Sequence, residues 1–337
     1  MSKRMKYSIG IGLTNDCDLN CAHCYRNKNE ISNITLKQIQ ILCDALPIQS
    51  IGLGTGENIL NPEFLQIITF LSEQDIKMSL ASNGLSLTSL ADNYLQLFND
   101  LEISIDFPDK KRHDNFRGSG NWDLAHQAIE KTKDLGVPTT ILTTMMSVNY
   151  QEMDNMVALA RKHELNLRVS VCQSVNSNKF HLEYEQFWEG FRLLLNKGKL
   201  ISCSEPVVRA ALGLNNVYSP CGHKSIRINP KGEVIPCVYW EGIDSSLDSI
   251  PKIEDLKEIG ENILNTYYFN LAREIPSVAA DCRCQGGCAS RRALSGNLDS
   301  HDEYCPWVRG DEIALNWQKA DSQDLVRVNN NCTTIVN

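Results

Sequence analysis

Residues 7–25 read YSIGIGLTNDCDLNCAHCY, a short β-type run followed at once by Cys17, Cys21 and Cys24 in one loop. Thiolates are soft ligands that select iron–sulfur clusters or zinc. A strand that leads straight into such a loop predicts a metal site at the end of that strand.

Strand and helix patterns continue to alternate up to about residue 180. We expect further strands at 50–54, 77–82, 101–107, 137–145 and 165–173, with helices at about 35–47, 61–74, 87–99, 121–136 and 150–164. Six strands alternating with five helices predict an α/β fold with a parallel sheet and right-handed crossovers. The periodicity alone leaves open whether the sheet is flat or curls into a partial barrel.

The alternation stops after residue 180. A helix is expected at about 182–196, and residues 225–238 read as a hairpin that turns at Pro230-Lys231-Gly232. We predict four regions: a core over 1–180, a linker helix and loop over 181–215, a cysteine-rich domain over 216–312 and a polar C-terminal tail over 313–337.

The composition narrows the class of protein. The 337 residues carry a net charge of −8 and no long basic stretch, which argues against a nucleic-acid partner. No apolar run is long enough to span a bilayer and the N-terminus lacks the pattern of a signal peptide, so we expect a cytoplasmic protein with no membrane partner. An odd number of cysteines, thirteen, then points to metal binding rather than to disulfides.

The first cysteine group matches a cluster with one open position. Three thiolates reach three irons of a [4Fe-4S] cubane and leave the fourth iron free, as a catalytic site needs. The alternative is a zinc loop that His23 completes.

The CX3CX2C spacing, followed by the aromatic Tyr25 in the loop after the first strand of a βα array, resembles the radical S-adenosylmethionine (SAM) superfamily. The resemblance implies a partial (β/α)6 TIM-like barrel whose open iron binds SAM. Reductive cleavage of SAM then yields a 5′-deoxyadenosyl radical, which abstracts hydrogen from the substrate. The resemblance also implies that Tyr25 lies near the adenine of SAM.

Residues at the strand ends extend the resemblance. Gly54-Thr55-Gly56-Glu57 is similar to the family's Gly-Gly-Glu-Pro, with Thr55 and Asn58 as departures. The resemblance implies that Glu57 accepts hydrogen bonds from the SAM ammonium and that Gly56 allows a close backbone approach. Asn83, in a segment similar to Thr-Asn-Gly, either caps its turn or faces the cofactor.

Four more polar residues are candidates for SAM contacts. Ser104 and Asp106 lie on the same face of a strand, from which both reach toward the ribose and methionyl part. Arg117 resembles the arginine that often meets the SAM carboxylate, an exposed loop arginine being the alternative, and Thr144 ends the fifth strand.

The later cysteines resemble the SPASM extension, which houses auxiliary [4Fe-4S] clusters. The matching parts are a CX10GX4C hairpin, a CX1CX3C step where the family commonly has CX2CX5CX3C, and Tyr-Cys-Pro; their cysteines are Cys221, Cys237, Cys282, Cys284, Cys288 and Cys305. A zinc ribbon is the alternative.

Two cluster arrangements are open. By order along the chain, Cys221, Cys237 and Cys288 fit a first auxiliary cluster. Cys282, Cys284 and Cys305 fit a second, and each set has room for another ligand such as Cys203. One closed four-cysteine cluster with spare thiols is the alternative. We favour two clusters, because six matched cysteines exceed what one cluster needs.

The resemblance defines the chemistry better than the substrate. We expect maturation of a ribosomally made peptide by a cross-link or other oxidation, with a flavodoxin or ferredoxin as reductant. The alternatives are a small-molecule dehydrogenase or epimerase for a sugar or aminocyclitol, and an iron–sulfur electron carrier. An epimerase needs a hydrogen donor, for which Cys172 and Cys203 are candidates unless they are buried core thiols.

Overall fold

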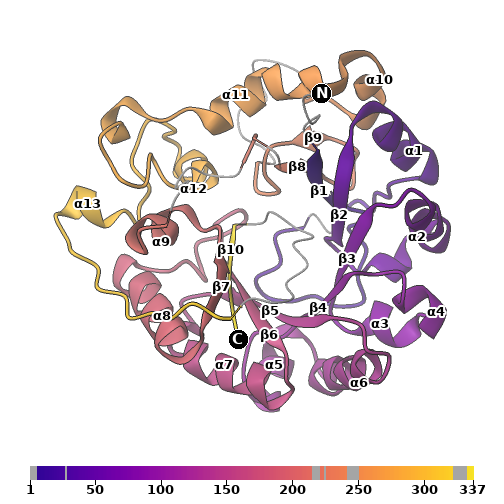
Figure 1. The fold of residues 1–337 in the computed structure, drawn as a ribbon, viewed down its shortest axis with the longest axis horizontal. Helices are drawn as coiled ribbons and strands as arrows, with labels where there is room; N and C mark the ends of the chain where they lie inside the picture. Colours follow the sequence, from indigo (N-terminus) through magenta and orange to yellow (C-terminus); the bar gives the residue numbers. More distant parts are fainter. Residues whose placement is uncertain (1–5, 27–28, 215–220, 224, 241–249, 322–331) are drawn as a thin grey trace.

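The computed structural model describes residues 6–26, 29–214, 221–223, 225–240, 250–321 and 332–337. Its centre is one ten-stranded sheet (Figure 1) in the order β7-β10-β6-β5-β4-β3-β2-β1-β8-β9. The six expected strands lie in it as parallel neighbours: β1 (Tyr7–Gly12), β2 (Ile48–Gly54), β3 (Lys77–Ser82), β4 (Asp100–Ser104), β5 (Thr139–Met145) and β6 (Asn166–Val171).

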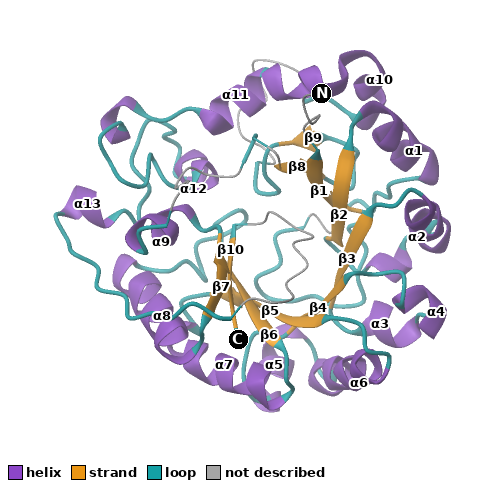
Figure 2. Cartoon of the chain, in the orientation of Figure 1, coloured by secondary structure: helices purple, strands orange, loops and turns teal. Residues whose placement is uncertain are grey.

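The sheet is curved, and the helices that connect its parallel strands cover its outer face (Figure 2). These helices are α1 (Leu36–Ala45), α2 (Phe64–Glu73), α3 (Leu85–Ser89), α4 (Asp92–Leu95), α5 (Lys110–Arg117), α6 (Asn121–Asp134) and α7 (Met153–Lys162). The partial barrel implied by the sequence is therefore confirmed.

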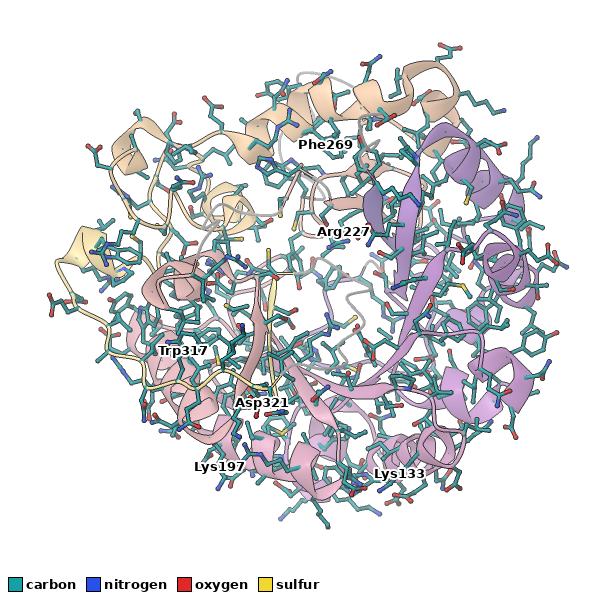
Figure 3. The ribbon with its side chains drawn as sticks, in the orientation of Figure 1. Lys133, Lys197, Arg227, Phe269, Trp317 and Asp321 are labelled. Carbon is teal, nitrogen blue, oxygen red and sulfur yellow. The ribbon has the colours of Figure 1, made fainter. Side chains whose placement is uncertain are left out.

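Alternating small and large residues on the strands explain why the inner face is hollow. On β1, Ile9 and Ile11 belong to the hydrophobic core, whereas Gly10 and Gly12, which line the inner cavity together with Ile11, carry no side chain. Successive side chains point to opposite faces of a strand, so the glycines leave space inside the arc. Arg227 uses that space (Figure 3), because a Cβ on Gly10 would lie 2.6 Å from its Nη1.

Added strands extend both edges of the barrel sheet. β8 (Ser225–Ile228) pairs in parallel with β1, and β9 (Val234–Ile235) folds back on β8. The expected hairpin is thus confirmed, and its Gly232 has a φ of +81° that favours glycine. The hairpin of the cysteine-rich region is part of the same sheet as the core.

The end of the chain also enters the sheet. β10 (Thr333–Val336) lies between β6 and β7 (Leu200–Cys203) and is antiparallel to both. Its residues are buried, whereas the sequence led us to expect a polar tail here. The strand is short and half of it is threonine, so no apolar run marked it.

The remaining described helices follow β6 in the chain. α8 (Tyr184–Lys197), expected from the sequence, packs on α7. The others are short: α9 (Pro206–Ala211), α10 (Leu256–Ile259), α11 (Tyr267–Arg273), α12 (Ala289–Leu294) and α13 (Pro306–Arg309). Within the described part of the chain, no helix is long and apolar enough to cross a membrane.

The buried position of β10 can be tested with Val336→Asp. Val336 is 0% exposed, so the new carboxylate would be buried without a partner and we expect a loss of more than about 3 kcal/mol in unfolding free energy. Val148, 47% exposed, provides the control: Val148→Asp should change stability by less than about 0.5 kcal/mol. Anaerobic denaturant unfolding measures both, and equal stability of the two variants would contradict the placement of β10.

Candidate active site

A cavity opens at the carboxyl ends of the parallel strands, on the inner face of the arc. Such ends converge on one side of a βα barrel, where sites form. Most residues expected to bind SAM or metal line this cavity: Cys17, Cys21, Cys24, Tyr25, Gly56, Glu57, Asn83, Ser104, Arg117, Thr144, Cys172, Cys221, Cys237 and Cys288. The described residues that line it do not include Asp106, Cys203, Cys282, Cys284 or Cys305.

A buried arginine organises the first cysteine loop. Arg26 is 8% exposed and donates from Nη1 to the carbonyl of Asn15 at 2.7 Å, and from Nη2 to the carbonyl of Leu19. Its Nε donates to the Cys24 Sγ at 3.2 Å. Arg26 thus holds the loop and places positive charge beside thiols that become anionic on metal binding. Nothing in the sequence pattern marked this residue.

The three thiols of the loop fit a cluster better than a single ion. They line one cavity, yet their Sγ atoms do not form a set within 4.8 Å of one another among the described residues. In a cubane each thiolate binds a different iron, so the sulfurs are spread by the width of the cluster. Burial raises the pKa of Cys17 to about 12, so iron has to displace its proton on binding.

The His23 side chain contacts an aromatic ring and a carboxylate. Its ring stacks on Phe116 with centroids 5.0 Å apart, and its Nε2 lies 3.7 Å from the Asp106 carboxylate. These contacts argue against the zinc loop in which His23 is the fourth ligand.

Gly56 allows two loops to touch. Thr55 and Gly56 have φ of +64° and +66°, and a Cβ on Gly56 would lie 2.4 Å from the Asp16 carbonyl oxygen. The adjacent Glu57 N–H donates to that same oxygen at 2.7 Å. The sequence led us to expect that Gly56 allows another group to approach the backbone closely. In the structure, the group that does so is the Asp16 carbonyl of the cysteine loop.

The Glu57 carboxylate is buried at the turn after β3. Oε1 accepts from Ser82 Oγ at 2.6 Å and from the Ser86 N–H at 2.9 Å, and Oε2 accepts from the Asn83 N–H at 2.9 Å. Burial raises the pKa of this carboxyl against the opposing effect of these hydrogen bonds. The Ser86 side chain also hydrogen-bonds to this carboxylate, so Glu57 is held firmly on the cavity wall.

Asp106 lies behind the cavity and orients Arg117. Its Oδ2 accepts from Arg117 Nε at 2.7 Å, and its Oδ1 accepts from the Thr144 N–H at 2.9 Å. Although full burial alone would raise the pKa of Asp106, Arg117 and His23 keep it below its usual value. Arg117 itself lines the cavity near Cys21, so Asp106 acts on the site through Arg117.

Four later cysteines come together on the same cavity. The Cys221 thiol is hydrogen-bonded to Cys237 and to Cys332, and Cys288 lies close enough to Cys237 and Cys332 for their charges to interact. All four line the cavity. The fourth ligand that the sequence left open, with Cys203 as a candidate, is thus matched in space by Cys332, which directly precedes β10. The β-branched run after Cys332 was the only signal for it.

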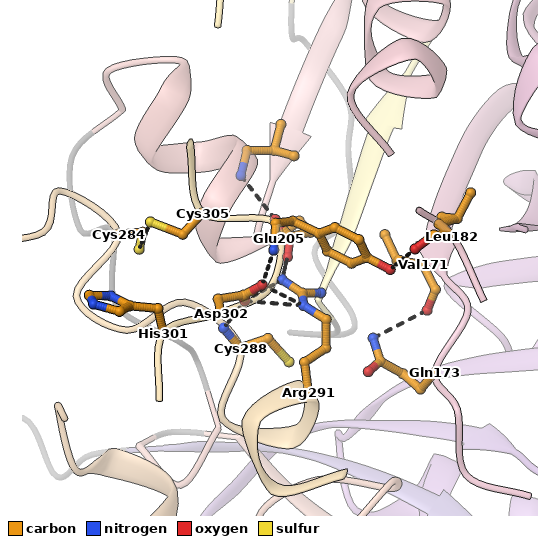
Figure 4. A network of polar contacts seen from close by, with 12 residues as sticks. Val171, Gln173, Leu182, Glu205, Cys284, Cys288, Arg291, His301, Asp302 and Cys305 are labelled. Carbon is orange, nitrogen blue, oxygen red and sulfur yellow. Dashed lines mark hydrogen bonds and ion pairs between the residues drawn. The ribbon is translucent and has the colours of Figure 1, made fainter. Parts of the chain in front are cut away.

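A buried ion network positions Cys288 (Figure 4). Arg291 pairs with Asp302 at 2.6 Å and with Glu205, and all three residues are at most 5% exposed. The Asp302 Oδ2 also accepts from the Cys288 N–H at 2.6 Å. The network therefore joins the segment after β7 to the cysteine-rich region, and sequence reasoning missed it.

The two cysteines considered as hydrogen donors differ in position. Cys172 directly follows β6, rather than lying within it, and is half-buried on the cavity wall. Burial raises its pKa to about 11, which keeps it a thiol at neutral pH. Cys203 is buried in the sheet, with Sγ 3.3 Å from Thr334 Oγ1 on β10.

The chain shows similarity to known proteins over most of its length. The radical SAM superfamily matches residues 11–160. The mycofactocin maturase MftC of Mycolicibacterium smegmatis is 24% identical over 335 residues, which cover 87% of this chain and 81% of that protein. The antilisterial bacteriocin subtilosin biosynthesis protein AlbA of Bacillus subtilis is 21% identical over 336 residues, covering 89% and 71%.

Solved structures share the fold. The anSMEcpe structure with bound AdoMet has a TM-score of 0.69 at 18% identity, covering 90% of this chain and 91% of that chain. Streptococcus suis SuiB bound to the precursor peptide SuiA has a TM-score of 0.68 at 15% identity, covering 88% and 75%. The family match begins near the end of β1 and contains the CX3CX2C loop and the ends of β2 to β5, so residues 11–160 match the radical SAM superfamily.

Proposed function

We propose that this radical SAM enzyme matures a ribosomally made peptide by abstracting hydrogen from an unactivated C–H bond, which leads to a cross-link or other oxidation. One observation carries the proposal: two groups of thiols line the same cavity. They are the open three-thiol site, formed by Cys17, Cys21 and Cys24, and the four-thiol site, formed by Cys221, Cys237, Cys288 and Cys332. Relatives named as a mycofactocin maturase and a bacteriocin biosynthesis protein support a peptide substrate, as does the solved complex of SuiB with a precursor peptide.

The chain's own residues bind and orient the reactants. When bound at Cys17, Cys21 and Cys24, the [4Fe-4S] cluster supplies the electron that cleaves SAM, and an auxiliary cluster supplies an electron acceptor. Glu57 offers an oxygen to the SAM ammonium, and Arg117, held by Asp106, offers charge to its carboxylate. Tyr25, Asn83, Ser104, Thr144 and Gly56 complete the SAM site in this proposal.

The electron balance of an oxidation fits this arrangement. One hydrogen atom passes from the substrate carbon to the 5′-deoxyadenosyl radical, which becomes 5′-deoxyadenosine and leaves a radical on the substrate carbon. Formation of a new bond at that carbon then releases one further electron and one proton. The four-thiol site lines the cavity in which that electron is released, so a cluster bound there is placed to accept it. A protein that only carried electrons would bind no substrate and would not need such a site beside a substrate cavity.

A reducing environment suits the site. All thirteen cysteines are free rather than paired in disulfides. We therefore place the enzyme in the cytoplasm, with a low-potential donor such as flavodoxin or ferredoxin as its reductant.

SAM cleavage is the first test. The anaerobically reconstituted full chain with dithionite and SAM should release 5′-deoxyadenosine, and Cys21→Ala should reduce that rate by at least about 1,000-fold because a cluster ligand is lost. Cys43→Ala, on the outer helix α1, is the matched control and should retain the rate. Equal rates in the two variants would refute the cluster assignment.

Cys332 tests the four-thiol site. Cys332→Ala removes one of the four thiols, so we expect a loss of up to about four irons per chain or a changed auxiliary EPR signal. Iron content and EPR spectra that match those of the Cys43→Ala control would show that Cys332 is not a ligand.

The position of Cys172 supports a second candidate function, epimerisation. A thiol on the cavity wall can return a hydrogen atom to a substrate radical. Candidate short precursor peptides serve as the test substrates, with sugars as the comparison and deuterated water as solvent. A cross-link removes two hydrogens and adds no deuterium, whereas epimerisation keeps the hydrogen count and adds one deuterium. Mass spectrometry distinguishes the two, and turnover of sugars but not peptides would contradict the main proposal.

A further inference from the structure

Three cysteines form a compact cluster away from the cavity. The Sγ–Sγ distances are 3.1 Å for Cys282–Cys284, 3.2 Å for Cys282–Cys305 and 3.4 Å for Cys284–Cys305. Three or more His, Cys, Asp or Glu side chains whose ligand atoms all lie within 4.8 Å of one another could hold a metal ion, and among the described residues these three cysteines form the group that meets this criterion. The thiols of Cys284 and Cys305 are buried, and Cys282 is half-buried.

This spacing is too tight for the second auxiliary cubane expected from the sequence. Each thiolate of a cubane binds a separate iron, which spreads the sulfurs. The thiols of Cys17, Cys21 and Cys24 do not all lie within 4.8 Å of one another. Although Cys221 is hydrogen-bonded to Cys237 and Cys332, no three of the four cavity thiols, all of which the structure describes, do so either. Around one tetrahedral zinc ion, with Zn–S bonds of about 2.3 Å, two sulfurs lie about 3.8 Å apart. A disulfide needs an S–S distance of about 2.05 Å, which none of the three pairs approaches.

The backbone separates this cluster from the four-thiol site. Gln285, Gly286 and Gly287 follow Cys284 with φ of +47°, +85° and +65°, so the chain turns sharply between Cys284 and Cys288. A Cβ on Gly287 would lie 2.3 Å from Asp302 Oδ2, which keeps the turn against the ion network. Cys288 therefore faces the cavity, whereas Cys284 faces the compact cluster.

Local N–H groups suit thiolates at this position. The backbone N–H groups of Trp307 and Val308 lie near the Cys305 thiol, and the Cys284 N–H lies near the Cys282 thiol. The N–H dipoles beside these sulfurs offset part of the negative charge that three thiolates bring to one ion.

We propose that Cys282, Cys284 and Cys305 bind a single thiophilic ion, Zn²⁺, in place of a second auxiliary [4Fe-4S] cluster. Three thiols release three protons as three Zn–S bonds form, with no change of oxidation state. No other described His, Cys, Asp or Glu places a ligand atom within 4.8 Å of all three sulfurs, so an exogenous ligand such as water takes the fourth position. The ion closes a segment with little regular structure, from Cys282 to α13, and stabilises it.

Metal analysis of the full chain tests the site. The chain is reconstituted anaerobically with iron, sulfide and zinc, and metals are counted by mass spectrometry. We expect about eight irons, for two cubanes, and about one zinc per chain. Cys282→Ala/Cys284→Ala should lose the zinc and keep the iron, and the Cys43→Ala control should keep both.

Three results of the metal count would overturn the proposal. About twelve irons per chain, of which the double variant loses about four, would indicate a second auxiliary cubane. A ninth iron without zinc would indicate iron at this site, and about eight irons with no other metal would indicate no metal there. A disulfide found by thiol titration of the reduced wild-type chain would overturn the proposal as well. Should the double variant fail to fold, zinc-edge X-ray absorption of the wild type decides. Three sulfur neighbours of one zinc support the site, and fewer exclude it. This inference does not depend on the peptide substrate.

Discussion

The double pairing of β1 is the constraint on which the site depends. β2 lies on one side of β1 and β8 on the other, both in parallel. The cysteine loop follows β1, the turn at Gly56 follows β2, and the hairpin that ends at Cys237 begins with β8. Parallel strands end at the same edge of a sheet, so the cysteine loop meets the Gly56 turn there. Cys221 and Cys237 flank the open end of the β8–β9 hairpin, and the pairing of β8 with β1 places them on the same cavity as the cysteine loop.

Close backbone contacts then set the positions of the metal ligands. The Gly56 turn meets the cysteine loop at Asp16, and the Gly287 turn meets Asp302 beside Cys288. Neither contact leaves room for a side chain, so the loops cannot shift without breaking buried hydrogen bonds. Buried arginines, Arg26 in one loop and Arg291 in the other, supply charge where anionic clusters bind.

The two ends of the sheet close on the same site. β10 pairs with β6 and β7 and brings Cys332 from the far end of the chain to Cys221. The ion pair between Glu205 and Arg291 links the segment after β7 to the cysteine-rich region. Core and auxiliary regions are therefore parts of one folded unit around the cavity, which suits a reaction in which a radical and an electron acceptor meet the same substrate.

The sequence by itself determined the βα alternation, the partial barrel, the open CX3CX2C site and the hairpin, because strand and helix periods and cysteine spacing are local properties. Most of the residues predicted to contact SAM line one cavity, since they follow strands whose ends share one edge. Only the tertiary structure decided that Cys332 joins Cys221, that Asp106 works through Arg117, and that Cys282, Cys284 and Cys305 converge too tightly for a cubane. These relations join residues whose side-chain directions depend on long-range packing, and spacing along the chain carries no record of that packing.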